Sequence, residues 1–305
     1  MTSLGNSPTP GKVDVLAPGL RRILAPNPSP MTFWGTNTYL IGREKLVIID
    51  PGPDSAAHLK AILGAVGSTK VHFILVTHAH LDHTPLAKRL GAEVNAPVLA
   101  YGDCHAGRSA VMQRLASEGL TDGGEGIDRD FQPDQIVSHG EVFASNEWYL
   151  EVMHTPGHMG NHIALRWDKA IFSGDLVMGW ASSLVSPPDG DLDDFLASCE
   201  ALKARGPEVL YPAHGAPVNP AIDRIDWLIE HRKDRTADIL SALAVGARSV
   251  DDLTAEIYKD TPKELLPAAA RNILAHLISL NESKLVRAKP KLGRNATYQL
   301  MPIKS

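Results

Sequence analysis

An apolar run at residues 70–77, typical of a buried strand, is followed at once by the letters HAHLDH. Three histidines and one aspartate therefore stand within six residues. At the end of an extended strand, His78 and His80 point to the same face. Asp82 and His83 follow where the chain turns into the next helix. Crowded, desolvated imidazoles are unfavourable without a partner, so this stretch predicts a metal site.

Three further apolar runs end in a histidine or an aspartate beside a glycine or a proline. They read WYLEVMHTPGH, KAIFSGD and EVLYPAH, and their last residues are His158, Asp175 and His214. Functional side chains are commonly held on loops at the ends of a rigid scaffold. We therefore expect one sheet edge to gather all four segments into one site.

The composition of this predicted site limits its chemistry. Five histidines and two aspartates, without a cysteine, suit zinc or another first-row ion. Seven ligands are too many for one tetrahedral ion, and they suit two ions that share a carboxylate and a solvent molecule. A metal pair of this kind can hold a nucleophile and a leaving group together. The pattern predicts a two-metal hydrolytic site.

The order of the predicted elements indicates two domains after a short arm. Strands alternate with helices over residues 21–220, which predicts a mixed α/β catalytic domain. Residues 221–305 change to helices followed by a β-ribbon, a pattern typical of a winged-helix-like domain. The helices are expected at 221–245, as one helix or two, at 250–258 and at 264–283. Residues 1–20, of which the first twelve are rich in Gly, Pro and Ser, are expected to form a flexible arm.

Charge and composition restrict the setting of the protein. The net charge of −5 gives the chain no general attraction for nucleic acid or anionic membranes. Two distant cysteines argue against a disulfide framework and fit a reducing compartment. No apolar stretch approaches the ~18 residues that a membrane span needs. We expect a cytoplasmic protein that does not bind membranes; the oligomeric state stays open, a homodimer included.

Four motifs resemble a known family when they are taken together. THAHLDH, TPGHMGNH, FSGD and YPAHG, within residues 77–215, are similar in order and spacing to the signature motifs of the metallo-β-lactamase superfamily. The resemblance implies an α/β fold, a four-layer αββα sandwich. It also implies one metal on His78, His80 and His158, a second on Asp82, His83 and His214, and Asp175 as the bridge. In this pattern Asp82 also orients a hydroxide between the metals.

Within the superfamily, the chain resembles the glyoxalase-II-like hydrolases and, more narrowly, the lactamase-β-like endoribonucleases. The segment NPSPMTFWGTNTYLIG and the tail after residue 220 are similar to parts of that group. The leading interpretation is a hydrolase with two zinc ions per chain, iron or manganese being alternatives. It would use a metal-bridging hydroxide on the carbonyl of a small-molecule ester, thioester or lactone.

Other functions on the same fold stay open. An endoribonuclease would use the same metals on single-stranded RNA, gripped by a basic tail of Lys284, Arg287, Lys289, Lys291, Arg294 and Lys304. A β-lactamase, a mononuclear iron persulfide dioxygenase and a non-catalytic binding module are further alternatives. Two zinc ions per chain would favour the hydrolase, and one iron the dioxygenase.

Three features near the motifs allow two interpretations each. His162 lies four residues after His158, and it either contacts substrate as a proton donor or only hydrogen-bonds beside the site. The acidic run at 187–194 is either a wall of the substrate cleft or a helix N-cap region. Trp34 either stacks on substrate or packs half-buried against the protein.

Overall fold

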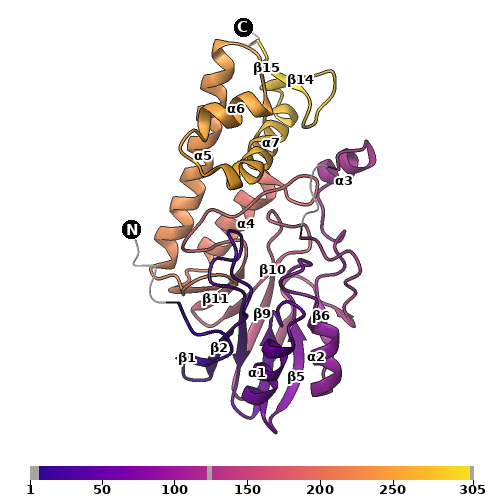
Figure 1. Ribbon diagram of the computed structural model, residues 1–305, viewed down its shortest axis with the longest axis vertical. Helices are drawn as coiled ribbons and strands as arrows, with labels where there is room; N and C mark the ends of the chain where they lie inside the picture. The colour runs from indigo at the N-terminus through magenta and orange to yellow at the C-terminus, as the bar shows by residue number, and fades with distance from the viewer. Residues whose placement is uncertain (1–6, 122–125, 303–305) are drawn as a thin grey trace.

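The computed structural model describes residues 7–121 and 126–302. Two β-sheets pack face to face, helices cover both outer faces, and a helical domain stands at one end (Figure 1). This is the αββα sandwich predicted from the sequence, and the expected α/β class is confirmed.

The first sheet contains seven strands that follow one another in chain order. They are β1 (Val13–Ala17), β2 (Leu20–Leu24), β3 (Asn37–Ile41), β4 (Lys45–Ile49), β5 (Lys70–Leu75), β6 (Val98–Ala100) and β7 (Gln135–Ile136). The first four strands pair antiparallel, and the pairs from β4 to β7 are parallel. The parallel half requires crossover connections, and helices α1 (Ala56–Val66) and α2 (Ala87–Val94) supply two of them.

The second sheet has five strands in the order β12-β11-β10-β9-β8. Their bounds are β8 (Val142–Ala144), β9 (Tyr149–His154), β10 (Ile163–Trp167), β11 (Ala170–Gly174) and β12 (Val209–Pro212). The last pair, β11 with β12, is parallel and the other pairs are antiparallel. Helix α4 (Leu192–Ala204) makes the parallel crossover between β11 and β12.

Strand β4 shows why the sheets are covered on both faces. Leu46 and Ile48 pack outward with the residues of α1 and α2, and Val47 and Ile49 pack inward between the two sheets. Successive side chains of a strand point to opposite faces. A strand that is apolar at every position after its first residue, Lys45, therefore fits only between two layers, as parallel strands generally do.

Helix α1 has local start and stop signals that the sequence makes visible. The hydroxyl of Ser55 accepts a hydrogen bond from the backbone N–H of His58, which caps the first turn. At the other end Gly67 adopts a φ of 56°, and its N–H donates to the carbonyl of Leu63. Both ends of this helix are therefore set by residues that adjoin it in the sequence.

The C-terminal domain contains three α-helices and a small sheet. Its elements are α5 (Ala221–Val245), β13 (Arg248–Ser249), α6 (Val250–Ile257), the 3₁₀ helix η1 (Lys263–Leu265), α7 (Leu266–Glu282), β14 (Val286–Lys289) and β15 (Thr297–Leu300). Residues 221–245 form one helix rather than two. The expected two-stranded ribbon is a three-stranded sheet, because the short β13 pairs with β15. None of the described helices is long and apolar enough to cross a membrane.

The expectation of a flexible arm at residues 1–20 is wrong from Val13 onward. Strand β1 pairs antiparallel with β2, and Val13 lies opposite Ile23 at the edge of the first sheet. The turn between them contains Pro18 and Gly19, which has a φ of 81°. This dipeptide is a hairpin signal that the proline-rich composition obscured. Residues 1–6 lie outside the described part of the chain.

Packing does not follow the expected domain boundary at residue 220. Helix α3 (Ala110–Ser117), between β6 and β7, places Leu115 in the apolar core of the C-terminal domain, and Figure 1 shows it reaching toward that domain. Helix α5 spans two cores: Ile225 packs with α4, whereas Leu243 packs with α6 and α7. The two domains therefore share parts of their apolar interiors.

Replacing Leu115 by Ala should lower the free energy of unfolding by about 2–5 kcal/mol, the usual cost of truncating a buried leucine. Because Leu115 is 1% exposed against the C-terminal core, amide hydrogen exchange in α7 should accelerate as well. Gln113→Ala, at an exposed position of the same helix, is the control. Unchanged exchange in α7 would contradict the shared interior.

His58 should contribute to the pH dependence of stability. Burial lowers the pKa of His58 to about 4, and its Nε2 lies 2.8 Å from the hydroxyl of Thr38. The ordinary pKa is near 6.5, so the unfolded chain takes up this proton first. Stability is then lost as pH falls from about 6.5 to about 4.

Urea titrations of His58→Asn across that window should give a shallower dependence of unfolding free energy on pH than the wild type. His105→Asn, at an exposed position, is the matched control. Equal slopes in the two variants would contradict the assignment.

Candidate metal centre

All the strand-end residues predicted from the sequence meet in one place. His78 and His80 follow β5 of the first sheet, whereas His158, Asp175 and His214 follow β9, β11 and β12 of the second sheet. The expectation of one sheet edge is therefore wrong in this detail. The site lies where the strand ends of two packed sheets meet, and both sheets contribute side chains.

The first group contains three histidines and one aspartate. The atoms that His78, His80, His158 and Asp175 can offer to a metal all lie within 4.8 Å of one another. His78 Nε2 and His80 Nδ1 are 2.9 Å apart, and His158 Nε2 is 3.3 Å from the same His80 atom. Asp175 Oδ2 lies 3.9 Å from His78 Nε2 and 3.6 Å from His158 Nε2.

The second group contains Asp82, His83 and His214, whose ligand atoms also lie within 4.8 Å of one another. Asp82 Oδ2 is 3.1 Å from His214 Nε2 and 3.4 Å from His83 Nε2. The other carboxylate oxygen of Asp175, Oδ1, lies 3.3 Å from His214 Nε2 and 3.8 Å from His83 Nε2. Asp175 thus presents one oxygen to each group.

Orphaned polar atoms test whether these residues fit a metal. His83 Nε2 and Asp175 Oδ1 are buried and have no hydrogen-bond partner among the described residues. Buried polar atoms are nearly always paired, so two of them aimed at one point need an explanation. A divalent cation between imidazole nitrogens and a carboxylate would satisfy both atoms, and the donor set suits zinc.

The surrounding contacts fix which nitrogen of each ring faces the centre. His158 Nδ1 lies 2.7 Å from the carbonyl of Leu184, and His214 Nδ1 lies 3.1 Å from the carbonyl of Gly35. A carbonyl oxygen only accepts, so both rings hold their proton on Nδ1 and turn Nε2 inward. This orientation of the ring by an outer acceptor is typical of metal-binding histidines.

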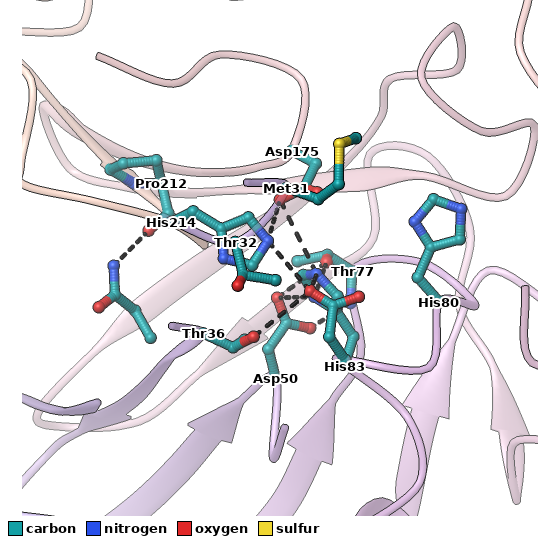
Figure 2. A network of polar contacts seen from close by, with 12 residues as sticks. Met31, Thr32, Thr36, Asp50, Thr77, His80, His83, Asp175, Pro212 and His214 are labelled. Atoms are coloured by element: carbon teal, nitrogen blue, oxygen red, sulfur yellow. Dashed lines mark hydrogen bonds and ion pairs between the residues drawn. The ribbon is translucent and has the colours of Figure 1, made fainter. Parts of the chain in front are cut away.

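Asp50 and Thr77 hold the other half of the site. Asp50 Oδ2 is 3.0 Å from His83 Nδ1, and its carboxylate accepts hydrogen bonds from the N–H and the hydroxyl of Thr77, each at 2.8 Å. Figure 2 shows His83, Asp50 and Thr77 together, with His214 and Asp175 beside them and His80 farther out.

Sequence reasoning missed Asp50. The available signal was an aspartate directly after the apolar strand KLVII, which is the strand-end pattern that identified Asp175.

The two groups differ in their affinity for protons. Burial lowers the pKa of His78 well below its ordinary value and that of His80 to about 3, so both rings have free lone pairs at neutral pH. Burial also opposes protonation of His214, but Asp175 and Asp82 outweigh it and raise its pKa to about 10. The two carboxylates therefore stabilise a positive charge beside them, which a metal or a proton can supply.

His162 has a different place from the one expected of a catalytic residue. Its ring is 0% exposed, its Nδ1 lies 3.1 Å from the carbonyl of Thr155, and its Nε2 accepts the backbone N–H of Asp175 at 3.2 Å. A buried ring with both nitrogens bonded cannot donate a proton to substrate. The contacts fit the alternative, a histidine that only hydrogen-bonds and thereby orients Asp175.

The position of His162 allows only glycine at residue 174. Gly174 has a φ of 50°, and a Cβ added there would lie 2.4 Å from His162 Nε2. Any side chain would displace the imidazole that holds Asp175. The glycine of the SGD motif is therefore required by this close approach.

The remaining ambiguous features are settled in part. Asp191 caps α4 by accepting from the N–H of Asp193, which confirms the N-cap interpretation of the acidic run. Trp34 stacks on Phe33 at 4.7 Å, and Phe33 stacks on Trp180 at 4.8 Å. This half-buried stack lies beside Gly215, the residue after His214.

Comparison with known proteins agrees with this geometry. The family described as "Metallo-beta-lactamase superfamily" matches residues 31–214, and "Beta-lactamase associated winged helix domain" matches residues 249–294. A protein of Drosophila melanogaster named "Beta-lactamase-like protein 2 homolog" is 31% identical over 87% of this chain and 89% of its own length. An "Atrochrysone carboxyl ACP thioesterase" of Aspergillus fumigatus is 29% identical over 76% of this chain and 67% of its own.

Solved structures show the same fold. A metallo-β-lactamase family protein from Thermus thermophilus superimposes with a TM-score of 0.74 at 24% identity, over 94% of this chain and all of its own (100%). A β-lactamase domain protein from Burkholderia ambifaria gives a TM-score of 0.77 at 22% identity, over 96% and 95%. The family match over more than half of the sequence is decisive: the chain belongs to the metallo-β-lactamase superfamily of metal-dependent hydrolases and ends in a winged helix domain.

Proposed function

We propose that this protein is a binuclear zinc hydrolase that attacks the carbonyl carbon of a small-molecule thioester or a related ester with hydroxide and breaks its bond to sulfur or oxygen. The observation on which the proposal rests is the geometry of Asp175. One of its oxygens faces the group of His78, His80 and His158, and the other faces His83 and His214. A carboxylate with both oxygens directed into adjacent ligand groups is suited to bridge two ions.

In this proposal, His78, His80 and His158 hold one ion, Asp82, His83 and His214 hold the other, and Asp175 contacts both. Two zinc ions at such a site would acidify water to a nucleophile near neutral pH and polarise a substrate carbonyl. That chemistry is the reason for assigning hydrolysis to the centre.

Asp82 is the residue of the chain best placed to act on the attacking water. Its side chain is 25% exposed, whereas those of His78, His83 and His214 are at most 1% exposed. Asp82 Oδ2 also accepts a hydrogen bond from the hydroxyl of Thr36 at 3.3 Å, which limits its rotation. A partly open, oriented carboxylate can hold the proton of a water molecule and set its direction of attack.

Two observations support a carbonyl substrate over single-stranded RNA. The similar protein of Aspergillus fumigatus is named as a thioesterase. In addition, part of the basic tail is occupied within the protein: Arg294 pairs with Asp251, and Lys291 donates to the carbonyl of Glu118 at 3.4 Å. These contacts reduce the charge left for a phosphodiester backbone. Lys304 lies outside the described residues.

Asp175→Asn should reduce the metal content from about two ions per chain to about one or fewer, because a neutral amide cannot replace a bridging carboxylate. Hydrolysis should be lost with the metal. Elemental analysis of the purified full chain measures this directly. Asp168→Asn is the matched control, an identical change at an exposed turn of the same sheet. Two ions retained in the Asp175 variant would contradict its bridging role.

The double variant Lys289→Gln and Lys291→Gln should hydrolyse an acyl thioester with kcat/KM within about twofold of the wild type, as expected for exposed surface changes. A second pair, Lys12→Gln and Lys60→Gln, removes the same charge elsewhere on the surface. Cleavage of single-stranded RNA should be assayed in parallel at several salt concentrations. The endoribonuclease would be favoured instead if RNA cleavage falls as the salt concentration rises, and falls in the Lys289/Lys291 variant but not in the Lys12/Lys60 variant.

A further inference from the structure

The segment between Asp175 and α4 connects the metal centre to the C-terminal domain. It begins at the bridging carboxylate and runs beneath His158, whose Nδ1 lies 2.7 Å from the carbonyl of Leu184. This contact directs His158 Nε2 toward the centre, where it lies 3.6 Å from Asp175 Oδ2. The position of one peptide group therefore determines the orientation of a metal-binding ring.

Both neighbours of Leu184 are held from the C-terminal domain. The carbonyl of Ser183 accepts a hydrogen bond from the guanidinium of Arg232, on α5. The N–H of Val185 donates to Asn272 Oδ1, on α7, at 3.0 Å. Arg232 also donates to Asn272 Oδ1 at 3.2 Å, so the two side chains form one unit around the Leu184 peptide.

The start of the same segment is fixed from α5 as well. Arg224 donates from Nε to the carbonyl of Met178 and from a terminal nitrogen to the carbonyl of Ala181, both at 2.7 Å. Arg232 lies eight positions after Arg224, about two turns of helix, so both point to the same side of α5. One face of this helix thus holds residues 178–183.

Holding this loop with the buried Arg232 costs free energy. It is 1% exposed, and its described partners are neutral: two oxygen acceptors and the ring of Phe195, 5.1 Å away. The described ion pairs include no carboxylate opposite it. Burying a cation without a counter-charge costs free energy. A buried arginine used in this way points to a geometric requirement rather than to a gain in stability.

We propose that Arg232 and Asn272 of the C-terminal domain are positioning residues for the metal centre, acting on His158 through the Leu184 peptide. The inference rests on the proposed binuclear site. It adds that the C-terminal domain controls the affinity of the three-histidine group, while His214 and His83 of the other group are oriented by Gly35 and Asp50 within the sandwich.

Asn272→Leu removes the shared acceptor at similar volume and tests this directly. In the full chain, one of the two zinc ions should bind about 10-fold more weakly, the lower end of the effect of losing an outer partner of a metal-binding histidine, because the Leu184 carbonyl is displaced rather than removed. The other ion should bind as in the wild type. Competition titration with a chromophoric zinc chelator gives both affinities, and the spectrum of the Co²⁺-loaded chain reports which coordination sphere changes.

Asn281→Leu is the matched control, because Asn281 is on the same helix but donates to the carbonyl of Val286 inside the C-terminal domain. Asn272→Asp keeps the acceptor oxygen and should restore wild-type affinity. Arg232→Lys is a second route if Asn272→Leu does not fold, since it keeps the charge but loses the forked donor. Arg232→Lys should weaken the binding of the same zinc ion.

The outcomes separate the two proposals. Equal zinc affinities in Asn272→Leu and Asn281→Leu, with two ions bound in the wild type, would overturn the positioning role and leave the binuclear site intact. A wild type that binds fewer than two ions would overturn both. The expected result is weaker binding of one of the two zinc ions in Asn272→Leu and Arg232→Lys, with wild-type affinity in Asn272→Asp.

Discussion

One buried and one partly buried carboxylate facing five imidazoles are the constraint on which the rest of the structure depends. Asp175 and Asp82 are costly to remove from water unless positive charge compensates them, and the rings are crowded enough to oppose protonation of one another. The sandwich meets this constraint by ending strands of both sheets at one place. Each inward nitrogen then needs an outward acceptor, so the loops that provide the carbonyls of Gly35 and Leu184 are fixed in turn.

The ligand motifs also support one another across the two sheets. His162 lies in the same turn region as His158, yet its contact is with the backbone of Asp175, and Gly174 is flanked so closely that only hydrogen fits. Misplacing one motif would therefore disturb the next one. Such interlocking keeps bridging geometry accurate, because a metal pair tolerates little error in the distance between its ligands.

Much of this could be predicted because the signals were local. The caps of α1 and the strand ends before His158, Asp175 and His214 are all visible within a few residues. The errors came from information that lies far away in the sequence. No local pattern shows that α3 completes a core built more than a hundred residues later, or that the strand ends belong to two sheets.

The same reasoning explains why the sequence left the role of His162 open. His162 follows a ligand at a suggestive spacing, but its role depends on Thr155 and on the Asp175 backbone, which only the folded chain brings to it. The division of the ligands into two groups likewise came from the family resemblance, and the structure places the same residues together.

The shared interior formed by α3 and α5 has a consequence for how such proteins can evolve. A winged helix domain attached by a linker can be exchanged between catalytic domains by recombination at the linker. In this chain a cut within α5 would divide a helix that packs against the sandwich at one end and the C-terminal domain at the other. It would also leave Leu115 without the side chains that cover it. Inheritance of the tail therefore requires inheritance of the α3 segment between β6 and β7, so the two segments should be gained or lost together in descendants of this chain.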